Sequence, residues 1–152
     1  MAEAYLNFRG SGRFRAESAG SHPASAVNHL AIDVLERHHI PWAGHSPRGM
    51  DGLEREPWDI VITVCDRAKE SCPYFPGQPI LAHWGMEDPA EAEGSDEVKR
   101  CAFDHAFVML ARRIDLLLAL PIDKLERLGL EGRIRAIGQT TPDSVGLTSS
   151  PP

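Results

Sequence analysis

Two cysteines seven residues apart are the strongest candidates for chemistry in this sequence. Cys65 follows directly on a continuous β-branched run at residues 60–64, and Cys72 stands just before Pro73. The residues between the two cysteines, 66–71, favour helix and contain no helix breaker. The predicted strand would therefore deliver Cys65 to the N-terminal end of a short helix, where the helix dipole favours a reactive thiolate.

The expected helix also sets a condition on any disulfide between these thiols. Seven helical residues at 1.5 Å of rise separate the two Cα atoms by about 10.5 Å. A disulfide tolerates only about 7 Å between Cα atoms. A Cys65–Cys72 disulfide would therefore require the short helix to unwind, and the Pro/Gly-rich residues 73–79 could take up the slack. Oxidation would then convert an ordered segment into a disordered one.

The same residues allow two other interpretations. Cys65 and Cys72 could be unrelated buried thiols, since free cysteine is among the most buried residue types. Cys65, Cys72 and His83 could also hold a metal ion, although their spacing matches no common zinc pattern. The third cysteine, Cys101, falls on the predicted apolar face of a long helix, so core packing is its expected role.

The elements that must position these residues alternate between strand and helix. Strands are predicted at residues 14–19, 60–64 and 80–84, and helices at residues 1–7, 28–39, from Ser95 to about residue 117, and 122–137. This order predicts an α/β fold in three layers, with a mostly parallel twisted sheet and helices on both faces. The apolar run at residues 60–64 predicts a strand that is buried on both faces. A chain that opens within a helix also suggests that one strand is missing in front of it.

Composition narrows the class of protein. The chain has 152 residues, 42% of them hydrophobic and 25% charged, with a formal net charge of −6. One domain is expected over residues 1–138, followed by a disordered tail over residues 139–152, which are rich in Thr, Ser, Pro and Gly. The negative charge argues against a nucleic-acid or membrane partner, and no apolar run reaches the length of about 20 residues that a membrane span needs. An odd cysteine count without an export signal favours the reducing cytoplasm.

A series of short motifs occurs in a fixed order along the chain. They are Ser18-Ala19-Gly20-Ser21-His22-Pro23, Val61-Ile62-Thr63-Val64-Cys65-Asp66, Cys72-Pro73-Tyr74-Phe75-Pro76-Gly77, His83-Trp84-Gly85, Asp88-Pro89 and Glu93-Gly94-Ser95. In this order they resemble the arsenate reductases that share the low-molecular-weight tyrosine phosphatase fold. The resemblance runs from Met1 to about Gly138, and residues 121–138 are similar to a C-terminal helical extension of bacterial members.

The resemblance implies a redox enzyme of arsenic resistance, in which three thiols act in turn to reduce arsenate to arsenite. Matched by motif, Cys65 corresponds to the second thiol, Cys72 to the third thiol, and Asp88 to the general acid. The resemblance implies no bound cofactor or metal, an arsenate oxyanion as substrate, and an external thiol donor of the thioredoxin or glutaredoxin type. Without the resemblance, the Asp88-Pro89 pair is typical of a simple turn.

The sequence departs from this family in its nucleophile. The family's first strand and its phosphate loop of pattern Cys-x5-Arg precede a helix that begins like Met1-Ala2-Glu3-Ala4. No Cys-x5-Arg occurs in the 152 residues, because the positions six after the three cysteines are Ser71, Gln78 and Phe107. We therefore expect this chain to be inactive as it stands, through a start assigned at an internal Met or through a real truncation.

Three further expectations follow from the same comparison of motifs. Arg48 stands where some relatives carry an acidic residue that helps to bind a monovalent cation, so no cation is expected. Unpaired strand edges beside a missing strand would invite a homodimer. The alternative functions are a protein that binds arsenite or senses oxidation without turnover, and a tyrosine phosphatase. The pair Cys65 and Cys72 counts against the phosphatase, because ester hydrolysis needs no resolving thiols.

Overall fold

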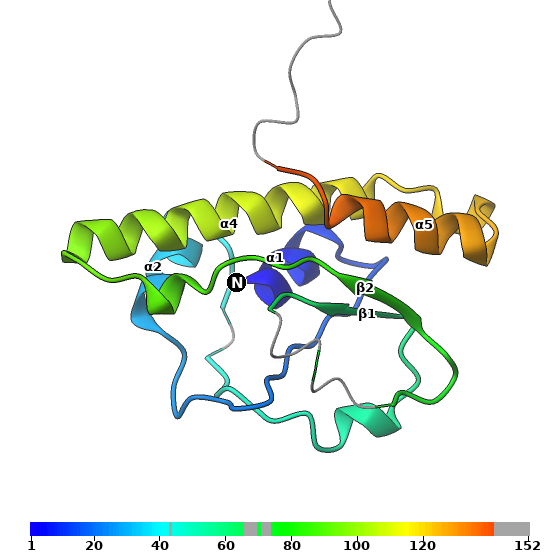
Figure 1. Ribbon diagram of the computed structural model, residues 1–152, viewed down its shortest axis with the longest axis horizontal. Helices are drawn as coiled ribbons and strands as arrows, with labels where there is room; N and C mark the ends of the chain where they lie inside the picture. Colours follow the sequence, from blue (N-terminus) through cyan, green and yellow to red (C-terminus); the bar gives the residue numbers. More distant parts are fainter. Residues whose placement is uncertain (43, 66–69, 71–73, 142–152) are drawn as a thin grey trace, which may run out of the picture.

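A computed structural model describes residues 1–42, 44–65, 70 and 74–141 of the chain (Figure 1). Four helices are present in this part of the chain: α1 (Ala2–Arg9), α2 (His29–Arg37), α4 (Asp96–Leu118) and α5 (Arg127–Ile137). Two strands, β1 (Ile60–Thr63) and β2 (Ile80–His83), form the sheet. Single 3₁₀ turns occur at η1 (Leu53–Arg55), η2 (Pro89–Glu91) and η3 (Ile122–Lys124).

The sheet confirms the predicted parallel arrangement. β1 pairs with β2 in parallel, with Ile60 opposite Ile80 and Thr63 opposite His83. The predicted burial of the first of these strands on both faces is wrong, because every residue of β1 is only half-buried. Its even-numbered side chains, Ile60 and Ile62, pack on the core, but the opposite face of the two strands lines an open cavity of about 350 Å³.

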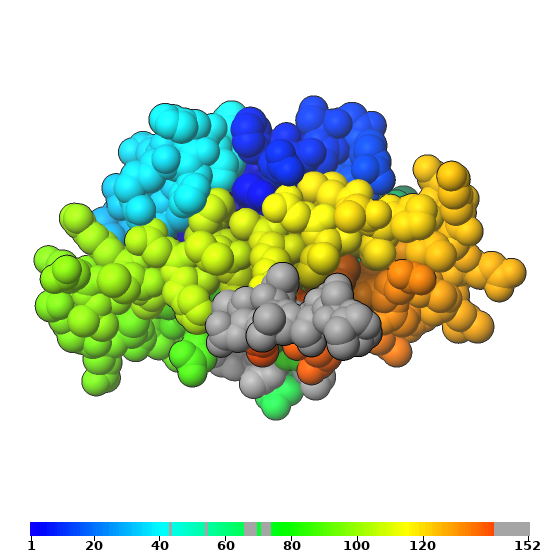
Figure 2. All heavy atoms as spheres, turned by 90° about the horizontal axis from the view of Figure 1, so that it is seen from above, coloured from blue at the N-terminus to red at the C-terminus, as the bar shows by residue number. Residues whose placement is uncertain are grey.

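Helices α4 and α5 lie on one side of this sheet, whereas α2 lies to the side of the strands and packs on α1 and α4 (Figure 1). Seen from above, α4 runs across the molecule, with α1 and α2 on one side of it and α5 on the other (Figure 2). One core cluster joins β2, α4 and α5, and a second joins α1, α2 and α4. The predicted short helix at residues 66–71 lies mostly outside the described residues, so a helical layer on the second face stays a prediction.

Local sequence signals account for where two of these helices begin. The Asn28 side chain accepts a hydrogen bond from the Leu30 main-chain N–H at 2.9 Å, and α2 starts at the next residue. The Ser95 hydroxyl accepts from the Val98 main-chain N–H at the start of α4. Such side-chain acceptors satisfy main-chain N–H groups that have no partner within the helix.

The predicted strand at residues 14–19 is wrong, because those residues have no strand beside them in the described part of the chain. Side chains of α1 bond to this segment instead. The Asn7 amide donates to the Ala16 carbonyl and accepts from the Ala16 N–H, and the Glu3 carboxylate accepts from the Ser18 N–H. Main-chain groups that would form a ladder are therefore satisfied without one. Directly after this segment, Gly20 forms an isolated parallel bridge with Gly49.

The C-terminal part of the chain packs on the outer edge of β2. The single helix predicted over residues 122–137 is broken into η3 and α5, because Leu125 and Glu126 are extended. The Arg135 side chain of α5 donates to the Leu81 carbonyl at 3.1 Å, and Arg127 donates to the Gln78 carbonyl. The outer edge of β2 is therefore covered by α5.

Beyond α5, Gly138 is buried and the Thr140 hydroxyl donates to the Ile137 carbonyl. Residues 142–152 lie outside the described residues, so the disordered tail stays a prediction. No helix in the described part of the chain is both long enough and apolar enough to cross a membrane.

Candidate functional site

The carboxyl ends of the two strands bring Cys65 and Asp88 to one edge of the sheet. The Trp84 main-chain N–H donates to the Thr63 carbonyl at 2.8 Å, and the Met86 N–H donates to the Val64 carbonyl at 3.1 Å. The main-chain pairing of these two segments therefore continues beyond the ends of β1 and β2. Cys65 follows Val64 directly, and Asp88 stands two residues after Met86. The loops that carry Cys65 and Asp88 therefore leave the same edge of the sheet, as expected at the carboxyl edge of parallel strands.

The structure describes the positions of two of the three cysteines, Cys65 and Cys101. Cys65 is half-buried at the end of β1. Cys72 lies outside the described residues, so its pairing with Cys65 and the metal site that would include His83 stay predictions. Cys101 was expected in the core, but it is exposed. It lies two residues before buried Phe103, and two steps of 100° turn a helical side chain to the opposite face.

Asp88 is an exposed residue that caps a turn. Its Oδ1 accepts a hydrogen bond from the Ala90 N–H at 2.9 Å, and the turn η2 follows directly. The interpretation of Asp88-Pro89 as a turn former is therefore confirmed. This role occupies one carboxyl oxygen, and no other described residue bonds to the second.

The neighbouring residues fix the end of β2. His83 is half-buried, and its Nδ1 lies 2.8 Å from the Thr63 hydroxyl of β1. Trp84 is only 2% exposed, and its indole N–H donates to the Ile134 carbonyl of α5 at 2.9 Å. The strand end that leads to Asp88 is thereby held by the sheet on one side and by the C-terminal helix on the other.

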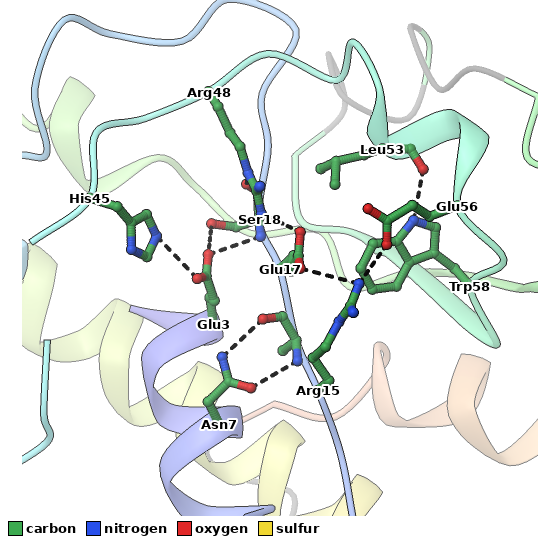
Figure 3. A network of polar contacts seen from close by, with 11 residues as sticks. Glu3, Asn7, Arg15, Glu17, Ser18, His45, Arg48, Leu53, Glu56 and Trp58 are labelled. Carbon is green, nitrogen blue, oxygen red and sulfur yellow. Dashed lines mark hydrogen bonds and ion pairs between the residues drawn. The ribbon is translucent and has the colours of Figure 1, made fainter. Parts of the chain in front are cut away.

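A second polar cluster surrounds the first turn of α1 (Figure 3). Besides the Ser18 main-chain N–H, the Glu3 carboxylate accepts from the Ser18 hydroxyl, and it lies 3.1 Å from Nε2 of His45. The Glu3 side chain is only 12% exposed, so these contacts replace the water that the carboxylate gives up. Sequence reasoning missed this cluster, because no spacing rule links Glu3, Ser18 and His45.

Arg48 extends the same cluster. Its Nη2 lies 2.6 Å from the Glu17 carboxylate, and its Nε donates to the Ser18 carbonyl at 3.2 Å. Arg15 in turn pairs with Glu17 and stacks over the Trp58 ring, 5.2 Å from its centroid. The guanidinium of Arg48 thus bonds to the main chain of Ser18 and to the side chain of Glu17, and so joins both residues to this cluster. No group of three His, Cys, Asp or Glu residues gathers to hold a metal ion among the described residues.

Comparison with known proteins identifies the family. Residues 1–127 match the family described as low molecular weight phosphotyrosine protein phosphatase. The chain belongs to this family. Its relatives include an arsenate reductase of Halalkalibacterium halodurans, 32% identical over 60% of this chain and 66% of the relative. An arsenate reductase of Oceanobacillus iheyensis is 41% identical over the same shares, and one of Bacillus subtilis is 27% identical over 75% of this chain and 81% of the relative.

The chain therefore spans just under two thirds of the first two relatives. Membership of the phosphatase family confirms the predicted α/β fold class and the predicted resemblance. Within that fold, the described candidate residues Cys65 and Asp88 lie at the carboxyl edge of the sheet. Among the described residues, the hydrogen bonds of the Glu3 cluster do not extend to that edge.

Proposed function

We propose that this chain carries the later part of an arsenate-reducing thiol relay, with Cys65 and Cys72 as the second and third thiols and Asp88 as the acid. The observation that carries the proposal is the pair of main-chain hydrogen bonds, Trp84 to Thr63 and Met86 to Val64, that joins the segments leading to Cys65 and Asp88. The relatives named arsenate reductase support the choice of an arsenic oxyanion as substrate.

The proposed chemistry balances as a two-electron reduction. A first cysteine thiolate forms a bond to arsenic(V) and water leaves, with Asp88 giving its proton to the departing oxygen. The Cys65 thiolate then attacks that cysteine's sulfur, and the sulfur–arsenic electron pair departs with arsenic as arsenite. The Cys72 thiolate next attacks Cys65, which frees the first thiolate and leaves a Cys65–Cys72 disulfide. An external dithiol reduces this disulfide and is itself oxidised.

The first cysteine of this relay is absent from the 152 residues, because they contain no Cys-x5-Arg. Such a loop supplies main-chain N–H groups and a guanidinium that hold the oxyanion against the nucleophile. Positioning of this kind can account for about 7–11 kcal/mol of a reaction barrier. We therefore propose that the 152-residue chain alone does not turn over arsenate, while its two relay thiols keep their chemistry.

The proposal also covers the partners and the compartment. A thioredoxin-type or glutaredoxin-type donor would reduce the Cys65–Cys72 disulfide. The reducing cytoplasm would then keep both cysteines in the thiol form. No bound cofactor is needed, since the thiols supply both electrons.

Controlled oxidation tests the thiol assignment in the chain as it exists. Mild oxidant should join Cys65 to Cys72, and peptide mapping should find Cys101 as a thiol. Cys101→Ser should leave the disulfide unchanged, whereas Cys72→Ser should abolish it. A main disulfide that includes Cys101 would contradict the proposed relay.

Activity tests the remaining roles in a chain extended before Met1 by a strand and Cys-x5-Arg. The extended chain should reduce arsenate with a thioredoxin system, and Cys72→Ser in it should allow at most one turnover. Asp88→Asn is a matched probe, because the Asn amide oxygen can still accept from the Ala90 N–H but cannot give a proton. It should slow the first step and leave the disulfide step intact. Steady turnover by the 152-residue chain would refute the proposal.

A further inference from the structure

The only buried charged side chain in the described part of the chain belongs to Arg113 of α4, which is 4% exposed. None of the described carboxylates pairs with it, and its Nε has no hydrogen-bond partner among the described residues. Burial lowers the pKa of Arg113 below its usual value. A buried guanidinium without a counter-charge is costly, so its remaining contacts must offset that cost.

Those contacts are four main-chain carbonyls from two separate segments. Nη1 donates to the Trp84 carbonyl at 2.8 Å and to the Gly85 carbonyl at 3.3 Å. Nη2 donates to the Gly138 carbonyl at 2.9 Å and to the Thr140 carbonyl at 3.4 Å. The first pair leaves the carboxyl end of β2, and the second pair follows α5. Arg113 therefore joins the end of the sheet to the C-terminal part of the chain.

The two joined segments also touch each other directly. A Cβ atom on Gly138 would lie 2.4 Å from the His83 carbonyl oxygen and 2.7 Å from Cδ1 of Trp84. Only glycine fits at that separation. The residues after α5 thus press against the end of β2, and the Arg113 fork closes the contact from the side of α4.

The segment that Arg113 holds is the one that aligns the proposed site. Residues 84–86 lie between the guanidinium on one side, through the Trp84 and Gly85 carbonyls, and the end of β1 on the other, through the bond from Met86 N–H to the Val64 carbonyl. Asp88 begins its turn two residues later. A shift of residues 84–86 would therefore move Asp88 and release the main chain next to Cys65.

We propose that Arg113 is a positioning residue, which uses the C-terminal segment as an anchor to keep Asp88 and Cys65 in register at the edge of the sheet. The reactive significance of that register rests on the proposed function, but the register itself does not. A residue that only stabilised the fold would, when changed, loosen the whole domain evenly. A positioning residue should loosen the Asp88 and Cys65 segments first.

Amide hydrogen exchange separates these two roles in the 152-residue chain. Arg113→Lys keeps the positive charge but loses the fork that reaches both segments. Exchange at the Met86 and Ala90 N–H groups should speed up about tenfold more than exchange in α2. The reason is that the loss of hydrogen bonds from a charged donor raises the equilibrium constant for local opening by at least this factor. The control is Phe107→Leu, which alters the buried cluster of α1, α2 and α4 and should leave the ratio between these amides and α2 unchanged or lower.

Thiol reactivity gives a second readout with an internal reference. Iodoacetamide should react faster with Cys65 in Arg113→Lys than in the parent chain, while exposed Cys101 should react at an unchanged rate. If Arg113→Lys does not fold, Gly138→Ala serves instead, since it keeps Arg113 but pushes the C-terminal anchor away from His83 and Trp84. It should produce the same local pattern.

Even loosening of all amides, or an unchanged Cys65 rate in a variant that folds, would overturn the proposal. Neither measurement uses arsenate, so a failure of the proposed arsenate chemistry would leave a positive result intact. A failure here would likewise leave the thiol relay untouched.

Discussion

Replacing Ile134 in α5 tests whether the C-terminal helix is part of the domain core. Its side chain is fully buried, at 0% exposure, in the cluster that includes Trp84, Ile114 and Leu117. Ile134→Ala should destabilise the chain by about 2–5 kcal/mol, because the deleted methyl groups leave a cavity that rigid neighbours cannot fill. That loss is a large fraction of the roughly 5–15 kcal/mol by which a domain is usually stable.

Leu128→Ala in the same helix is the matched control. Leu128 is 82% exposed, so its truncation should change the free energy of unfolding by no more than about 0.5 kcal/mol. Urea unfolding of both variants, followed by circular dichroism, gives the comparison, and one transition with an unchanged slope is expected for each. Equal effects of the two substitutions, or a separate early transition of α5 in the parent chain, would refute the reasoning that α5 belongs to the same core.

Two further predictions concern polar contacts of α1 and its neighbours. Burial raises the pKa of Tyr5 above its usual 10.0, and the Asp115 carboxylate, which accepts from its hydroxyl, raises it further. The folded state then holds this proton more tightly than the unfolded state does. The hydroxyl of Tyr5 therefore contributes fully to the free energy of unfolding below a pH of about 10, and this contribution is lost as the pH rises through the raised pKa. Denaturant unfolding on either side of that pH should show the decline, and Tyr5→Phe should lack this part of it. Arg48→Met should cost at most about 1 kcal/mol at low salt and less at high salt, because its pair with Glu17 is partly exposed and screened. A loss that is independent of salt would contradict that account.

Short-range sequence signals correctly predicted a strand, two helix starts and one buried helix face. The β-branched residues at Ile60–Thr63 form a strand, and the cap residues Asn28 and Ser95 start α2 and α4. The spacing of apolar residues in α4 also predicted the buried face that includes Phe103, Leu110 and Ile114, but it did not mark Phe107, which is buried as well. In each case neighbouring residues decide the outcome, so one sequence suffices.

Signals that depend on a distant partner were missed or misread. The segment at residues 14–19 has strand-like composition, but Asn7 and Glu3 satisfy its main chain in place of a neighbouring strand. The carbonyls around Arg113 come from residues 25 to 29 positions away, before it and after it, and no local pattern marks such a site. The candidate residues Cys65 and Asp88 were found through motifs, and their closeness follows from the parallel pairing of β1 and β2.

The two edges of this sheet differ, and the difference decides where a further strand can pair. The Asp59 and Thr63 carbonyls accept from Ile80 and Trp84, so the odd-numbered residues of β1 point their main-chain groups at β2. Ile60 and Ile62 point theirs the other way, and no described residue pairs with them. The outer edge of β2, by contrast, is covered by α5. An added strand, or a second copy of the chain, should therefore pair at β1.

Amide exchange can show this directly, because the two sets of β1 residues alternate. In the 152-residue chain the Val61 and Thr63 N–H groups should exchange slowly, and those of Ile60 and Ile62 should exchange faster. In the chain extended by a strand and Cys-x5-Arg, Ile60 and Ile62 should become as slow as their neighbours. If activity returned without that protection, the added strand would have paired elsewhere. If the Ile60 and Ile62 N–H groups already exchanged slowly in the 152-residue chain, dilution would test whether a second copy protects them. A dimer loses protection as it dissociates, so exchange rates that did not rise on dilution would rule out a second copy of the chain.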